Sequence, residues 1–267
     1  MNFNIAIGQY YPGDSFIHRL DPRVKLLATL NFIVVLFIAS NVFAYLISAG
    51  FLLTTIFISK VPPMYIIRGL KGIVVIVTFT VLLNMFFVPG ETVLFSIWRI
   101  TITLEGIFAA IAMGSRLIML IISSSVLTLT TSPIQLTNAI ESGLSPLKKV
   151  GFPVHEIAMM MTIALRFIPT LMEEADKIMK AQMARGASFD TGNIMKRAKS
   201  LIPILVPLFI SSFRRADDLA MAMEARCYRG DINRTKMKEL RYTSSDYKAF
   251  LFLAAFTTVI IYTRIHG

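Results

Sequence analysis

The sequence has few charged residues and a single cysteine. Charged side chains make up 16% of the 267 residues, whereas hydrophobic side chains make up 55%. This balance lies outside the range of ordinary soluble domains and is typical of membrane proteins. The lone cysteine, Cys227, excludes an internal disulfide and a pair of redox-active thiols.

Sequence motifs for catalysis, nucleotide binding and metal binding are also missing. The chain has no Gly-rich loop that ends in Gly-Lys-Ser or Gly-Lys-Thr, so it has no P-loop of its own. Its three histidines, His18, His155 and His266, lie too far apart in the sequence for metal-ligand spacing. We therefore expect a protein that is not itself an enzyme and that binds neither a metal nor a cofactor.

Long apolar runs are what the sequence has in abundance. About 20 apolar residues cross the hydrocarbon core of a bilayer. Five runs approach or exceed that length, at residues 24–40, 42–59, 70–88, 104–130 and 247–263. They predict an all-α, polytopic membrane protein with about five transmembrane helices. The segment between the third and fourth runs, residues 91–103, is predicted to form an external hairpin or a short helix.

The distribution of charge divides the chain into three parts. We expect an N-terminal membrane domain of four spans at 1–130, a cytoplasmic coupling domain at 131–246 and a C-terminal span at 247–267. Most of the 27 Lys and Arg fall on one side of this arrangement. The positive-inside rule then places the N-terminus in the cytoplasm and the C-terminus outside. Basic residues of the middle part alternate with acids and lack an aromatic platform, which favours lipid headgroups over nucleic acid.

The coupling domain is predicted to contain one short helix, at 133–142, and two long, crossed amphipathic helices, at 154–185 and 193–228. Apolar side chains recur every three or four residues along each long helix, which is typical of a face that packs against a partner. The opposite faces carry mixed charges that include Glu174 and Arg215, and we expect these faces to meet solvent.

Each long helix ends in an arginine that continues its apolar stripe. The first end reads Ala184-Arg185-Gly186 and the second reads Ala225-Arg226-Cys227. Small neighbours leave room for another backbone to come close, so the two ends are predicted to be docking tips for a separate protein. The helix dipole favours an arginine at a C-terminus in any case, and this is the alternative explanation for either residue alone.

Arg116 is the main ionisable residue inside the predicted spans. An arginine at that depth is costly and usually faces protein or water. Two interpretations are open: a tie to main-chain carbonyls or to a polar residue such as Asn84, and a contact used during transport. Ion-coupled carriers normally have intramembrane carboxylates or broken helices. The spans show neither clearly, so we expect the energy for transport to come from a partner.

Several segments together resemble the transmembrane T component of energy-coupling factor (ECF) transporters. The matching segments are the opening block Asp14–Arg23, the stretch Leu127–Pro133 and the two arginine tips. The resemblance covers the whole chain in order and length. The family's tips read Ala-Arg-Gly or a close variant, so Cys227 is a departure. The stretch Glu224–Gly230 looks like the shared type of module, which serves several exchangeable S components.

The resemblance implies a set of partners in the plasma membrane of a prokaryote. Two cytoplasmic ATPases, which bind ATP and Mg²⁺, would dock on Ala184, Arg185, Gly186, Ala225, Arg226 and Cys227. A small membrane S component would bring a vitamin and would contact Met159, Met160, Met161, Leu205 and Phe209. Ordinary packing is the alternative explanation for the methionines. The competing functions are the permease subunit of a conventional ABC importer, a secondary carrier and a non-transporting membrane scaffold.

Overall fold

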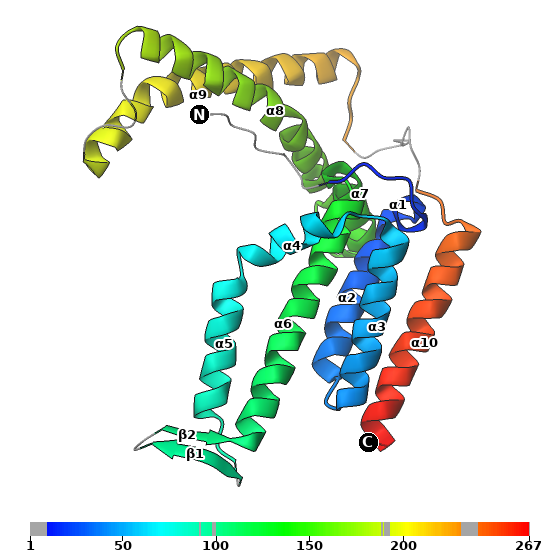
Figure 1. Ribbon diagram of the computed structural model, residues 1–267. Helices are drawn as coiled ribbons and strands as arrows, with labels where there is room; N and C mark the ends of the chain where they lie inside the picture. Colours follow the sequence, from blue (N-terminus) through cyan, green and yellow to red (C-terminus); the bar gives the residue numbers. More distant parts are fainter. Residues whose placement is uncertain are drawn as a thin grey trace. The chain divides into compact units, whose positions relative to one another are not determined.

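The computed structural model describes residues 10–90, 92–97, 100–187, 189, 193–230 and 240–266. Regular structure is almost entirely helical, which confirms the all-α membrane class (Figure 1). Contacts divide the chain into two units. We call residues 1–143 with 239–267 the membrane unit and residues 144–238 the helical hairpin unit.

The membrane unit is a bundle of long helices with the shorter helices α1, α4 and α7. Its helices are α1 (Phe16–Arg19), α2 (Pro22–Ile38), α3 (Val42–Ser59), α4 (Pro63–Lys71), α5 (Val74–Phe87), α6 (Leu104–Thr130), α7 (Pro133–Leu144) and α10 (Ser244–His266). The helices α3 and α6 have the predicted bounds, and α2 and α10 begin and end within three residues of the predicted runs.

Among the described residues, length and composition allow four helices to cross a membrane, namely α3, α6, α10 and the hairpin-unit helix α8 (Val154–Ala184), and the bent pair α4–α5 would make a fifth. The helix α2 is slightly shorter, with 17 residues. Because α8 is long and apolar enough to span, its placement in the cytoplasm remains a prediction.

The third predicted span, 70–88, is wrong in one respect. Its first residues belong to α4, and the membrane helix α5 begins only at Val74, with a bend of 62° between the two helices. The break contains Gly72, a weak helix former, and the amide of Ile73 bonds to the carbonyl of Leu70 instead of continuing the helix.

Side chains beside the first residues of α2 and α7 cap these helices. Asp21 accepts a hydrogen bond from the amide of Arg23, and Pro22 occupies the first helical position of α2. Ser132 and Gln135 form a reciprocal capping box at the start of α7, in which each side chain accepts the other residue's amide. These contacts explain why the helices begin where the sequence predicts.

The core of the membrane unit is aromatic and lies among α2, α3 and α10. Phe32, Phe51 and Phe256 stack on one another, with ring centroids 4.3–6.0 Å apart. Aromatic pairs of this kind contribute beyond the area that they bury. The stack holds the first two long helices against the last one, from the other end of the sequence.

The segment after α5 forms a β-hairpin, one of the two predicted alternatives. Its strands are β1 (Val93–Ile97) and β2 (Ile100–Thr103), which pair antiparallel. Residues 98 and 99 between them lie outside the described part of the chain.

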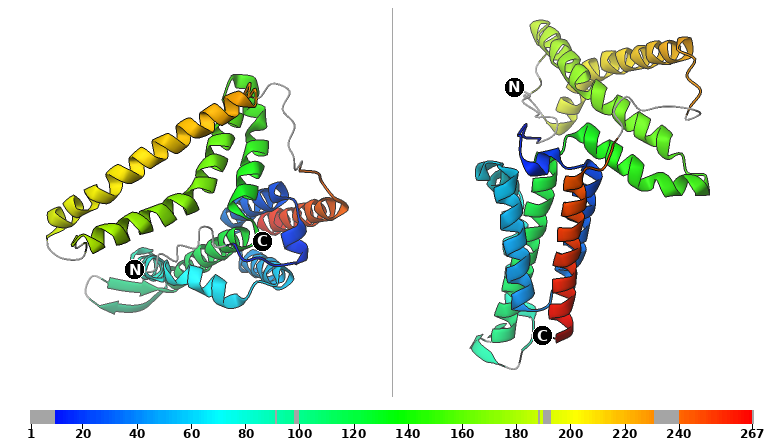
Figure 2. Two further views of the ribbon diagram at one scale, coloured as in Figure 1. Left: turned by 90° about the horizontal axis from the view of Figure 1, so that it is seen from above. Right: turned by 90° about the vertical axis from the view of Figure 1, so that its right-hand side faces the viewer.

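The helical hairpin unit consists of the 3₁₀ segment η1 (Ser145–Val150), α8 and α9 (Ile194–Ala225). The helices α8 and α9 contact each other and cross at an angle, as the right-hand view of Figure 2 shows. Arg215 bonds to Glu174, and Tyr228 bonds to Met159. A later residue of α9 therefore meets an earlier residue of α8, so the helices are antiparallel. Glu174 and Arg215, which belong to the predicted polar faces, are half-buried, and their 2.8 Å ion pair joins the two helices.

Candidate functional site

The first predicted docking tip is a closed helix end. Arg185 is the C-cap residue of α8. The amide of Gly186 bonds to the carbonyl of Met183 at 2.9 Å, and the amide of Ala187 bonds to that of Gln182 at 3.0 Å. This pair of bonds is the Schellman motif, in which two carbonyls of the last turn find partners. The main chain beside Arg185 is thus fixed by its own hydrogen bonds.

The second tip repeats this geometry. Arg226 is the C-cap residue of α9. The amide of Cys227 bonds to the carbonyl of Glu224 at 2.8 Å, and the amide of Tyr228 bonds to that of Met223 at 3.0 Å. Two helices with different sequences therefore present an arginine at the same place in the same main-chain motif.

The residue after each arginine has a positive φ, which is +89° for Gly186 and +56° for Cys227. Glycine adopts this conformation without steric cost, whereas other residues do so at a cost. A Cβ on Gly186 would meet no atom of the described residues beyond its chain neighbours within 4 Å. Conformation therefore accounts for the glycine, in addition to the room for a partner that the sequence suggests. Cys227 adopts the same turn, so the departure from glycine leaves the shape of the second tip intact.

Both arginines are exposed, and within the described part of the chain neither side chain has a hydrogen-bond or ion-pair partner. Each guanidinium carries five N–H donors in a planar fork, which suits a carboxylate or a row of carbonyls on another protein. The small residues Ala184 and Ala225 beside them are exposed as well. The tips can therefore be reached by a partner.

The two tips lie at opposite ends of the hairpin unit because α8 and α9 are antiparallel. Arg185 precedes the start of α9, and Arg226 follows its end. The 32 residues of α9 span about 48 Å at 1.5 Å per residue. One chain can therefore offer two similar binding points that are far enough apart for two separate proteins.

Apolar residues of the hairpin unit that were predicted to contact a membrane partner are largely exposed. The exposed fraction is 58% for Met160, 57% for Leu205 and 67% for Phe209, and Met161 is exposed too. Met159 is half-buried, and its sulfur accepts a hydrogen bond from the Tyr228 hydroxyl at 3.1 Å. Four of these five residues are thus accessible, while the fifth connects α8 to the second tip.

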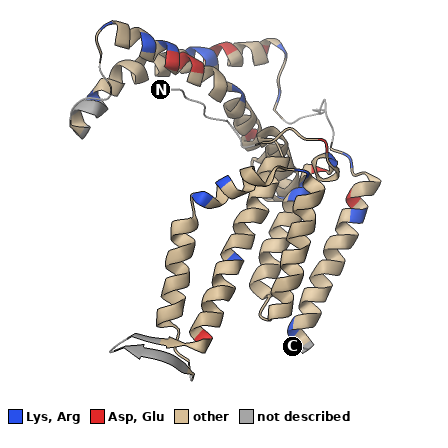
Figure 3. Cartoon of the chain, in the orientation of Figure 1, with Lys and Arg blue, Asp and Glu red and all other residues tan. Residues whose placement is uncertain are grey.

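Arg116, in the middle of α6, contacts the turn between α2 and α3. Its Nη2 donates to the carbonyl of Ala39 at 3.1 Å, and the guanidinium lies 5.5 Å from the ring centre of Phe37 and 5.7 Å from that of Tyr45. Asn84 donates instead to the carbonyl of Thr80 in its own helix. Apart from residues such as Arg116, charged groups are concentrated near helix ends and on α8 and α9 (Figure 3).

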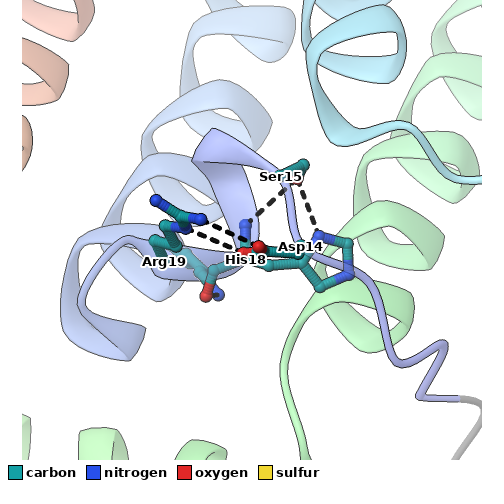
Figure 4. Close-up of polar contacts among 5 residues, drawn as sticks. Asp14, Ser15, His18 and Arg19 are labelled. Atoms are coloured by element: carbon teal, nitrogen blue, oxygen red, sulfur yellow. Dashed lines mark hydrogen bonds and ion pairs between the residues drawn. The ribbon is translucent and has the colours of Figure 1, made fainter.

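The opening block folds onto itself as a small polar cluster (Figure 4). Arg19 makes two 2.8 Å bonds to the carboxylate of Asp14, and the hydroxyl of Ser15 lies 2.7 Å from Nδ1 of His18. The Nε2 atom of His18 donates to the carbonyl of Tyr11, because a carbonyl can only accept. Burial lowers the pKa of His18, while the hydrogen bond to the Tyr11 carbonyl acts in the opposite direction. Since Asp14 binds Arg19 and not the histidine, these residues make no catalytic triad.

Metal-binding groups are absent from the described residues, where no three His, Cys, Asp or Glu side chains gather in a way that could hold an ion.

Comparison with known proteins gives the family. A model described as the cobalt transport protein CbiQ matches residues 13–237. The energy-coupling factor transporter transmembrane protein EcfT of Thermosediminibacter oceani is 58% identical over 92% of this chain and 93% of that protein. The EcfT proteins of Clostridium kluyveri and Acidaminococcus fermentans are 55% and 52% identical, each over 98% of this chain and 97% of their own length. This chain belongs to the EcfT family. The family assignment made from the sequence is confirmed, and an EcfT protein is a multi-pass membrane subunit of a prokaryotic ECF transporter.

Sequence reasoning missed the contacts that hold the EcfT hairpin unit together. The Glu174–Arg215 pair spans two helices that are predicted separately, so only their antiparallel order could have suggested it. The Tyr228–Met159 bond gave no signal in the sequence. The turn at Gly186 did have a signal, because glycine after the last helical residue is typical of a Schellman end.

Proposed function

We propose that this EcfT protein couples ATP hydrolysis by two cytoplasmic ATPases to vitamin uptake through exchangeable S components. The ATPases bind ATP and Mg²⁺ and dock on the two arginine tips. The S component carries the vitamin and contacts the exposed apolar side chains of Met160 and Met161 on α8 and of Leu205 and Phe209 on α9. This chain transmits the movement of the two ATPases to the S component and catalyses no reaction.

The observation that carries the proposal is the repeated tip. Arg185 and Arg226 occupy the same position in two Schellman motifs, both are exposed, and they lie at opposite ends of one hairpin. The helix dipole explains an arginine at one helix end. It does not explain why both ends share the same cap, the same exposure and the same small neighbours.

The proposed orientation follows from charge. The tips belong to the region that is rich in Lys and Arg, and the positive-inside rule places such regions in the cytoplasm, where ATP is available. The N-terminus is then cytoplasmic and the C-terminus lies outside.

Co-purification from native membranes tests the docking role. We expect the wild-type chain to bring two ATPases and at least one small membrane protein, and the Arg185→Ala/Arg226→Ala double variant to lose the ATPases. Truncating one member of a desolvated charge pair costs about 2–5 kcal/mol, which is enough to dissociate a complex. The matched control is Arg214→Ala, which removes an exposed arginine from the body of α9. A double variant that keeps its ATPases and takes up vitamin normally would refute the role of the tips.

The same experiment separates the alternatives. A secondary carrier would purify alone and transport in liposomes without ATP. The permease of a conventional ABC importer would purify with a substrate-binding protein in a fixed ratio. A scaffold would support no ATP-dependent uptake.

A further inference from the structure

The membrane unit contains an apolar cavity that the coupling role does not use. It has a volume of about 420 Å³ and lies among α1, α2, α3, α6 and α10. Its lining residues in the four long helices lie within ten residues of a helix end, at the start of α2 and α10 and at the end of α3 and α6. The cavity is therefore near one end of the bundle and not at its middle.

The walls of the cavity have few polar groups to offer. Four threonines line it, but each hydroxyl donates to a carbonyl of its own helix, at distances of 2.7–3.0 Å. The four are Thr29, Thr54, Thr55 and Thr130. A buried water needs two to four polar partners, so these walls suit hydrocarbon better than water.

Two lysines line the cavity, and they differ in what they bind. The ammonium of Lys25 is buried and donates to the carbonyls of His18 and Thr130, at 3.0 and 2.9 Å. Lys248 is exposed, and among the described residues its side chain has no hydrogen-bond or ion-pair partner. It is the basic group at the cavity that remains available to a ligand.

Two carboxylates lie near these lysines, but neither lines the cavity. Asp246 accepts from the amide of Asp21 at 2.8 Å and from the amide and hydroxyl of Thr243 at 2.7 Å. Asp21 accepts from the amide of Arg23 and pairs with its guanidinium. Both carboxylates are therefore engaged with main-chain and side-chain donors, and the charge of Lys248 is left without a direct partner.

We propose that the cavity holds an acyl chain of an anionic glycerophospholipid whose net negative headgroup binds Lys248. The helices around the cavity are surrounded by lipid, so acyl chains of phospholipids are the apolar groups available to fill it. A position close to the helix ends is the depth at which acyl chains meet headgroups. An exposed lysine at that level attracts anionic lipid. Apolar walls and one free cation are thus complementary to the two parts of such a molecule.

Native mass spectrometry of the full chain tests this site, with phosphatidylglycerol and phosphatidylcholine of identical acyl chains as the probes. We expect a single lipid adduct that favours phosphatidylglycerol by about fivefold, the factor for one lysine near an anionic lipid. Lys248→Gln should remove this preference. The matched control, Lys71→Gln, changes an exposed lysine of α4 that does not line the cavity and should keep the preference.

A second variant tests the acyl chain independently of charge. Ala28→Phe places a large side chain in the cavity and should abolish the adduct with both lipids. Lys248→Gln keeps the cavity intact, so it tests the site even if the filled variant does not fold. Equal binding of the two lipids by the wild type, or an unchanged preference in Lys248→Gln, would overturn the proposal. A folded Ala28→Phe variant that retains the adduct would overturn the proposal as well. So would a wild type that binds no lipid, which would indicate that another membrane protein fills the cavity.

Discussion

At the scale of single residues, the turn after each arginine gives a test of the tips. We expect Cys227→Gly to stabilise the protein by about 0.5–1 kcal/mol. The left-handed conformation costs cysteine about 1–2 kcal/mol, and the greater freedom of glycine in the unfolded chain offsets part of the gain. Thermal unfolding of the purified chain measures the change. The reverse substitution at the first tip, Gly186→Ala, should destabilise by about 1 kcal/mol. Stability that does not respond to either change would contradict the positive φ values.

His18 gives a test by pH. Burial lowers the pKa of His18 below its ordinary value of 6.5, while the Tyr11 carbonyl and Asp14 act in the opposite direction and Lys25 adds to the lowering. A lowered folded-state pKa means that the group contributes stability above its unfolded pKa and that this contribution is lost as pH falls. We expect the unfolding temperature to drop when the pH is lowered from 7.5 to about 5.5. The drop should be smaller in His18→Gln, and an equal drop in both proteins would rule out His18 as its source.

Residue-level features could be predicted only in part. The arginine tips were found because their stripes and small neighbours repeat along the sequence. The positive φ of Cys227 had no such signal, since cysteine rarely adopts that conformation and the turn is imposed by the bonds to Glu224 and Met223. The half-buried position of Met159 depends on Tyr228, which is distant in sequence.

At the scale of helices, Arg116 connects α6 to the end of α2 through the Ala39 carbonyl. A hydrogen bond from a charged donor contributes about 1.5–3 kcal/mol, so Arg116→Met should lower the unfolding temperature while the ATPases remain bound. Measuring unfolding and co-purification together separates the two open roles of this residue. A variant with unchanged stability that no longer supports uptake would show that Arg116 acts in transport.

The membrane helices could be predicted where the apolar run and its flanking signals agree. The runs of α3 and α6 are bounded by turn residues and caps, and their bounds are as predicted. The run from 70 to 88 is largely apolar despite Lys71 and Gly72, so its mean hydropathy does not reveal the break after Lys71. The bend depends on how α4 and α5 pack against α6, which is tertiary information.

At the scale of the whole molecule, the antiparallel hairpin makes the two tips independent sites. We expect Arg185→Ala and Arg226→Ala, made singly, each to lose one ATPase, because α9, about 48 Å long, separates the two sites and they share no residues. The mass of the intact complex gives the number of ATPases directly. A single variant that loses both ATPases would show instead that the two bind only as a pair, which is itself informative about how the complex assembles.

The short helix α5 has a consequence for the membrane itself. Its 14 residues span about 21 Å, whereas the hydrocarbon core is about 30 Å thick. Arg68 and Lys71 at the end of α4 favour the headgroup level, so α4 adds little to the span. The bilayer beside α5 must therefore become thinner, at an elastic cost that falls as acyl chains shorten. In bilayers of graded chain length, we expect unfolding temperature to be highest at a shorter chain than the 27-residue α6 alone would require, and a maximum at the thickness that matches α6 would contradict this.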